Sequence, residues 1–99
     1  MVVPFAVSYS VDRFRLELIQ AVPGTIWNAG EAGRLHHLGY WSEDLHRDGA
    51  SLEADGAPVA ARSERWSYHR FADYYIELLD VAGRPAMEER WQQAPDCLS

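Results

Sequence analysis

The chain has 99 residues, of which 47% are hydrophobic and 24% charged, so it fits one ordinary globular domain and not a disordered protein. Its formal net charge is -6, and all nine of its basic residues are arginines. This argues against nucleic acid or a membrane surface as the partner, because phosphate contacts need clustered cations. The single cysteine, Cys97, cannot form an internal disulfide, and "MVVPFAVSYS" lacks the basic flank of a signal peptide, so we expect a cytoplasmic protein.

The first third of the chain predicts a β-hairpin followed by a loop. Residues 2–9 and 13–21 are rich in Val, Phe, Tyr, Ile and Leu and are separated by polar residues, as in two paired strands. Residues 22–33 contain one proline and three glycines, which predicts a connecting loop. Residues 34–41 then read as a third strand.

A helix is predicted over residues 43–55, with Ser42 or Asp44 as its N-cap. Its apolar positions recur at helical spacing, and Gly56 stands where a helix would stop. Beyond it we expect a short strand at 58–61, and the same reading gives "WSYHR" and "YYIELLDVA" as two further strands.

The tail predicts one more helix, at 85–93, with Pro85 in its first turn and with Met87 and Trp91 as packing residues. The order of elements gives an α+β fold, in which a mixed β-sheet carries one principal helix and a βαβββ unit follows a β-hairpin. We expect a single domain over residues 1–99, with 83–99 as its C-terminal tail.

Side-chain alternation singles out three ionisable residues, because each lies near the middle of a predicted strand. They are Glu17 in "FRLELIQ", His37 in "RLHHLGYW" and Glu77 in "YYIELLD". A carboxylate among strongly β-forming apolar residues is costly unless it is paired, exposed or bound to a cation. Two carboxylates and an imidazole from separate strands suit a divalent metal such as Zn, Ni, Co or Mn. The alternative is three polar side chains that face water on the open side of a sheet.

The segment "GRLHHLGYWSEDLHRDGASLEADGAPV", followed by "YHRFADYYIELLD", resembles the second βαβββ module of the vicinal oxygen chelate superfamily. That superfamily includes glyoxalase I, methylmalonyl-CoA epimerase, extradiol dioxygenases and bleomycin-resistance proteins. The stretch "LELIQAVPGTIW" looks like the end of the first module in the epimerase-like branch. The resemblance covers roughly residues 13–82 and implies a cup-shaped site for a small molecule.

In metal-binding members of this superfamily, each module supplies one ligand from its first strand and one from its last. Carried onto this chain, the resemblance implies Glu17, His37 and Glu77 as metal ligands. His36 falls on the opposite face of its strand and is expected to be structural. Relative to the family pattern, the chain begins near the third strand of the first module, so the fourth ligand would come from water or a second chain. His46 or His69 could also supply it, and the spacing favours neither.

Two functions and one non-functional reading follow from these residues. The first is a metal-dependent lyase, isomerase or epimerase acting on a small oxygenated substrate, with Glu17 or Glu77 doubling as the catalytic base. The second is a metal-free binding module of the bleomycin-resistance type, whose cup stacks a planar ligand. The expected substrate-binding residues of that cup are Trp41, Tyr75, Trp66 and Trp27. The third is a degenerate fragment that only dimerises. An exposed strand edge and apolar cup also predict a homodimer.

Overall fold

A computed structural model describes residues 6–11, 14–19, 21–27 and 35–93 of the chain. These residues fall into two compact units. One unit comprises residues 1–30 together with 85–99, and the other comprises residues 31–84.

The first unit contains the predicted hairpin. Strands β1 (Ala6–Val11) and β2 (Phe14–Ile19) pair antiparallel, and Ser8 lies opposite Glu17. On β2, Leu16 and Leu18 are 42% and 54% exposed, so the face that alternation marks as apolar is not a buried one. In the same unit the guanidinium carbon of Arg15 lies 5.0 Å from the ring centre of Trp91, a cation–π contact that packs the tail tryptophan.

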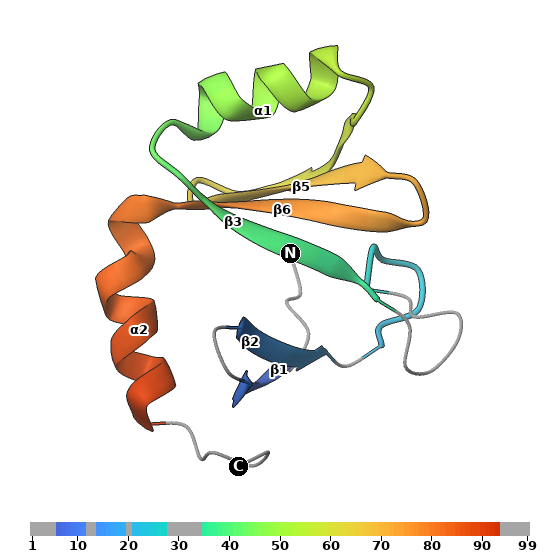
Figure 1. Cartoon of the computed structure of the whole chain (residues 1–99). Coiled ribbons are helices and arrows are strands. Elements are labelled where there is room, and N and C mark those ends of the chain that lie inside the picture. The colour runs from blue at the N-terminus through green and yellow to red at the C-terminus, as the bar shows by residue number, and fades with distance from the viewer. Residues whose placement is uncertain (1–5, 12–13, 20, 28–34, 94–99) are drawn as a thin grey trace. The chain divides into compact units, whose positions relative to one another are not determined.

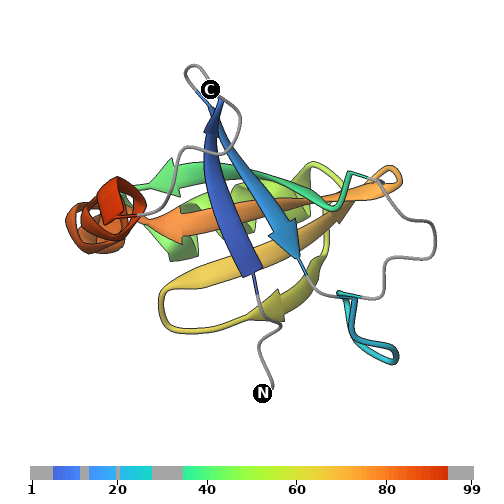
Figure 2. The ribbon, with the colours of Figure 1, turned by 90° about the horizontal axis from the view of Figure 1, so that it is seen from below.

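The second unit is a four-stranded mixed sheet in the order β3-β6-β5-β4 (Figures 1 and 2). The strands are β3 (His37–Ser42), β4 (Val59–Arg62), β5 (Trp66–Phe71) and β6 (Tyr74–Asp80). The first and last strands of the unit, β3 and β6, run parallel beside each other, whereas the other neighbours are antiparallel. This arrangement confirms the predicted α+β fold with a βαβββ unit.

Helix α1 (Leu45–Ala54) lies along one face of this sheet, in contact with β5 and β6 (Figure 1). Its buried residue is Gly49, whose lack of a side chain lets the helix approach the sheet closely. The least exposed side chains of the unit lie in this layer or on its strands: Ser42, Ala57, Ser67, Tyr68, His69 and Leu78.

Of the two N-cap residues predicted for α1, Ser42 and Asp44, the structure shows Asp44 in that role. Asp44 is the N-cap, because its carboxylate accepts a hydrogen bond from the backbone N–H of Arg47 at 3.0 Å. Ser42 makes different contacts, since its hydroxyl accepts from the N–H of Asp44 at 3.2 Å and donates to the Asp48 carboxylate at 2.6 Å. Ser42 is 1% exposed, so this pair of bonds ties the end of β3 to the first turn of α1.

Replacing Ser42 by alanine is expected to raise the pKa of Asp48. The hydrogen bond from Ser42, followed by that from Arg47, holds the pKa of this carboxyl below its usual value. A lowered folded-state pKa contributes stability above the ordinary pKa, and that contribution is lost as pH falls through the lowered value. In the Ser42→Ala variant, the Asp48 carboxylate should therefore contribute less stability, and less stability should be lost as pH falls. An NMR titration of Asp48 in both proteins measures the change, and an unaltered pKa would contradict the assigned role of Ser42.

The helix predicted at 85–93 is present, and a short 3-10 turn precedes it. A 3-10 turn (Val81–Gly83) leads from β6 into helix α2 (Arg84–Gln93), which has Pro85 in its first turn. No helix within the described ranges is long and apolar enough to cross a membrane.

Candidate functional site

His37 and Glu77 meet on the sheet face opposite α1. In the parallel pair β3–β6, Gly39 lies opposite Glu77 and His37 opposite Tyr75, so the side chains of His37 and Glu77 point to the same face. The imidazole Nε2 of His37 lies 3.3 Å from Oε1 of Glu77. Their side chains are only 11% and 12% exposed, so water screens the pair weakly. Two of the three ionisable residues that alternation singled out therefore lie beside each other.

Gly39 keeps the space beside this pair open. It lies between His37 and Trp41 on the same face of β3, and it carries no side chain. A Cβ built there would meet a methyl carbon of Leu79 at 3.4 Å and Oε1 of Glu77 at 3.8 Å. Both distances are ordinary van der Waals contacts, so a side chain that extends beyond Cβ would be needed to crowd the Glu77 carboxylate.

His36 does not point to the opposite face, and the expectation drawn from strict alternation is wrong for this residue. Strand β3 begins at His37, so His36 precedes the strand and its side chain is not bound by the alternation. Its Nδ1 atom lies 2.8 Å from Nδ1 of His37, within hydrogen-bond distance. The two rings are nearly perpendicular, with centroids 5.1 Å apart. His36 therefore belongs to the same site as His37.

Aromatic rings surround the two histidines. The ring of Tyr68 lies 5.2 Å from that of His37 and 5.8 Å from that of His36, and Tyr75 lies 5.2 Å from His36. Tyr68 is 5% exposed, and the β5–β6 register places it opposite Glu77. Sequence reasoning missed Tyr68, although it alternates with Trp66 in "WSYHR". The missing information was the register that brings β5 beside Glu77.

Three of the four predicted substrate-binding residues share the face of His37 and Glu77, because the register aligns Tyr75 with His37 and both Trp66 and Trp41 with Leu79. The ring of Trp66 lies 5.3 Å from that of Tyr68. The guanidinium carbon of Arg84 lies 5.6 Å from the ring centre of Trp41.

The fourth predicted substrate-binding residue, Trp27, belongs to the hairpin unit, where it is 5% exposed. Glu17 also belongs to that unit, on β2, where its side chain is exposed. The roles of Glu17 and Trp27 therefore stay predictions. Within the described ranges, no three His, Cys, Asp or Glu side chains lie close enough together to hold a metal ion. The two metal-ligand candidates that the structure brings together are His37 and Glu77.

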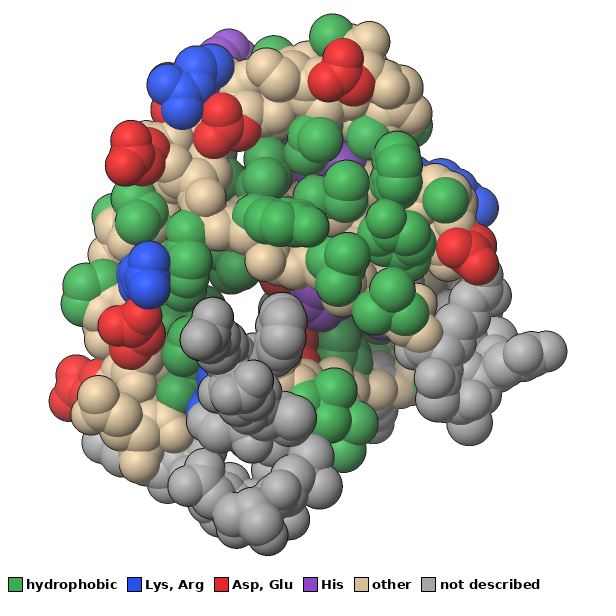
Figure 3. All heavy atoms as spheres, in the orientation of Figure 1, with side chains coloured by type: hydrophobic (Ala, Val, Ile, Leu, Met, Phe, Trp, Pro, Cys, Tyr) green, Lys and Arg blue, Asp and Glu red, His purple; other side chains and the backbone are tan. Residues whose placement is uncertain are grey.

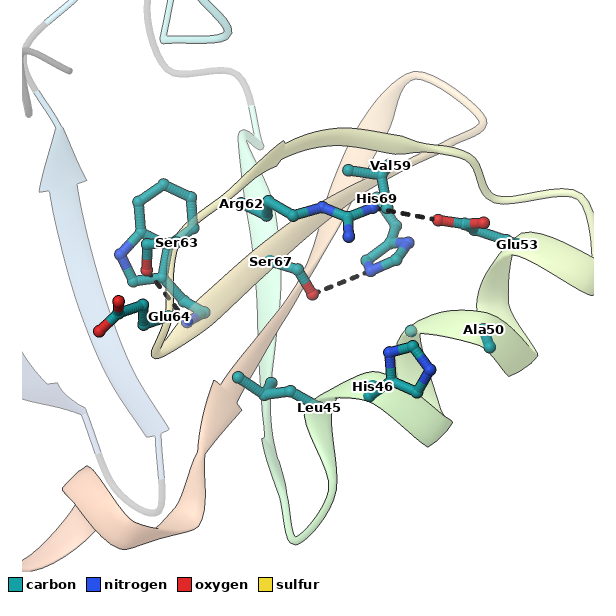
Figure 4. A pocket seen from close by; sticks show the side chains of 12 residues that line it. Leu45, His46, Ala50, Glu53, Val59, Arg62, Ser63, Glu64, Ser67 and His69 are labelled. Carbon is teal, nitrogen blue, oxygen red and sulfur yellow. Dashed lines mark hydrogen bonds and ion pairs between the residues drawn. The ribbon is translucent and has the colours of Figure 1, made fainter.

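His46 and His69, the other candidates for a further ligand, belong to the opposite side of the sheet, where a separate pocket of about 300 Å³ lies between α1 and the β4–β5 hairpin (Figure 4). His69 is fully buried there. Its Nδ1 lies 3.1 Å from the carbonyl oxygen of Ala57, and its Nε2 lies 2.9 Å from the hydroxyl of Ser67. A carbonyl only accepts, so Nδ1 carries the proton and Nε2 accepts from Ser67. His69 is thus a satisfied core residue.

The comparison with protein families agrees with this architecture. A family model described as the Glyoxalase/Bleomycin resistance protein/Dioxygenase superfamily matches residues 3–82. No curated protein and no solved structure matches the chain. The family match covers most of the chain, including every strand of the four-stranded sheet and helix α1. The chain belongs to the Glyoxalase/Bleomycin resistance protein/Dioxygenase superfamily, which is the vicinal oxygen chelate family that its sequence resembles.

Proposed function

We propose that this protein is a metal-dependent lyase, isomerase or epimerase of the glyoxalase type, acting on a small oxygenated substrate. The observation that carries the proposal is the approach of His37 Nε2 to Glu77 Oε1 at 3.3 Å on a weakly exposed sheet face. Both are ligand atoms of the kind that Zn, Ni, Co and Mn accept.

The spacing of these two atoms fits a shared cation. Metal–ligand bonds of about 2.0–2.2 Å place two donor atoms of a tetrahedral ion roughly 3.3–3.6 Å apart. The pair therefore needs little rearrangement to bind an ion together. We propose Glu17 as the third ligand on the strength of the family resemblance, with water or a second chain completing the set.

A divalent cation at this position would act as a Lewis acid on a substrate oxygen. Side chains of the protein would transfer the proton and enclose the substrate. The carboxylate of Glu17 or Glu77 would move a proton at the adjacent carbon, which is general base catalysis. The rings of Tyr75 and Trp66 would pack against the substrate and exclude water from it.

Elemental analysis of protein purified without chelator, repeated after loading with each of the four metals, tests the proposed function. The expected result is close to one metal ion per chain in the loaded protein, with less in a Glu77→Gln variant. A wild-type protein that cannot be loaded with Zn, Ni, Co or Mn would rule the metal-dependent enzyme out.

A second candidate function, metal-free sequestration of a planar ligand, is favoured by the cluster of rings on the same face. Tyr68 is buried and packs edge-on against His36, His37 and Trp66. The half-buried rings of Trp66 and Tyr75 beside it offer stacking surfaces. Quenching of tryptophan fluorescence by 1-anilinonaphthalene-8-sulfonate, in protein treated with chelator, separates the two functions. Saturable quenching in a protein that takes up no metal would support sequestration.

The homodimer also remains a proposal, supported by the edge of the sheet. β3 is an end strand of the four-stranded sheet, and its Leu38 and Tyr40 are 41% and 53% exposed. Figure 3 shows hydrophobic side chains gathered over this part of the sheet, below the charged surface of α1. A second copy would cover such a surface. Light scattering should give twice the chain mass, and a particle of 11.2 kDa would contradict the dimer.

A further inference from the structure

The hydrogen bond between His36 and His37 limits which ring nitrogens can carry a proton. Nδ1 of His36 and Nδ1 of His37 lie 2.8 Å apart, so one proton must lie between them and one ring must donate to the other. The other nitrogen of His37, Nε2, faces Glu77 at 3.3 Å. Both nitrogens of His37 are therefore engaged, one by each neighbour.

Two proton arrangements satisfy the contact between the two histidines with neutral rings. In the first, His37 carries its proton on Nε2 and donates it to the Glu77 carboxylate, while His36 donates to Nδ1 of His37. In the second, His37 carries its proton on Nδ1 and donates it to His36, which leaves a lone pair on Nε2 facing the Glu77 carboxylate, so a cation must lie between these two acceptors. Only the second arrangement allows His37 to bind a cation through Nε2.

We propose that His36 is a positioning residue, which accepts the Nδ1 proton of His37 when a divalent cation is bound and so holds the ring with its Nε2 lone pair directed at the cation beside Glu77. A metal-binding histidine generally donates its second ring N–H to an acceptor that sets its tautomer and orientation. Here the acceptor would be the neighbouring imidazole. The proposal rests on the metal-dependent function above and gives a role to a residue outside the predicted ligand set.

The surrounding rings hold this pair in place. Tyr68 packs edge-on against His37, with an angle of 90° between the rings, and it also contacts His36 at 67°. Tyr75 covers His36 at a tilt of 43°. Because Tyr68 is 5% exposed and lies on a central strand, the two imidazoles have little room to turn away from each other.

Two variants of His36 separate positioning from packing. His36→Phe keeps a ring of similar size but removes the acceptor, whereas His36→Asn keeps an acceptor near the position of Nδ1. We expect His36→Phe to weaken Zn²⁺ binding by about 10- to 100-fold, as changes of such outer partners do. His36→Asn should recover most of that loss. His46→Ala, which alters an exposed histidine on α1, should bind Zn²⁺ like wild type.

The ¹⁵N spectrum of the imidazoles gives a readout that packing alone would not move. Zinc-loaded wild type should show His37 protonated on Nδ1. Chelator-treated wild type should show it protonated on Nε2, towards Glu77. A variant that fails to fold would leave this measurement on wild type to decide.

Different results would overturn this proposal and the proposed function. Wild-type zinc affinity in a folded His36→Phe variant, or zinc bound with His37 unprotonated on Nδ1, would overturn the positioning role and leave the metal site standing. A wild-type protein that takes up no Zn²⁺ would overturn both.

Discussion

Replacing His69 by alanine should lower the free energy of unfolding by about 3–4 kcal/mol, a large part of the stability of a small domain. The imidazole is fully buried beneath α1, and its removal leaves a cavity next to Gly49. It also removes both hydrogen bonds of the imidazole, from the Ser67 hydroxyl to Nε2 at 2.9 Å and from Nδ1 to the Ala57 carbonyl at 3.1 Å. At about 4–8 °C per kcal/mol, the midpoint of thermal unfolding should fall by more than about 10 °C.

Two further variants make this test specific. His69→Asn keeps a donor that can reach the Ala57 carbonyl and should lose less stability than His69→Ala. His46→Ala changes an exposed histidine on α1 and should stay within about 0.5 kcal/mol of wild type. Equal stability of His69→Ala and His46→Ala, measured by chemical denaturation, would show that His69 does not support the core.

Replacing His37 by alanine should weaken Zn²⁺ binding by more than about 100-fold, beyond the effect of altering an outer partner. The variant removes the nitrogen ligand and leaves Glu77 as the candidate ligand on β6. The fold should persist, because the side chain lies on the face opposite α1 and not in the layer between the helix and the sheet. Isothermal titration with Zn²⁺ measures the change in affinity.

The matched control for His37→Ala is His46→Ala, which removes the same chemical group from the opposite side of the sheet. It should bind Zn²⁺ with wild-type affinity. If the two variants bind Zn²⁺ equally well, His37 is not a metal ligand.

Alternation singled out His37 and Glu77 because both residues lie inside strands, where successive side chains point to opposite faces. The family resemblance supplied what alternation cannot, namely that β3 and β6 are neighbours. His36 was misplaced because it lies one residue before β3, where the backbone no longer dictates the direction of the side chain. A shift of one residue in the predicted start of the strand therefore assigned His36 to the wrong face of the sheet.

Other features of the site depend on register between distant strands. Tyr68 lies beside Glu77 only because of the β5–β6 pairing, which no local pattern encodes. The capping choice at α1 was open for a similar reason, since Ser42 and Asp44 are both good caps. In the structure Asp44 is the cap, whereas Ser42 is buried and its hydroxyl donates to the Asp48 carboxylate. Burial of this kind depends on how the sheet and the helix pack, which the local sequence does not show.

Titration of Mn²⁺ into ¹⁵N-labelled protein tests most directly whether His37 and Glu77 hold one divalent cation. A bound paramagnetic ion broadens the amide signals nearest to it. The signals of His37, Gly39 and Glu77 should therefore disappear first and saturably, while those of Asp48 and Glu53 on α1 persist. Broadening that begins at the acidic residues of α1, or that grows without saturation across the surface, would contradict a metal site at this pair.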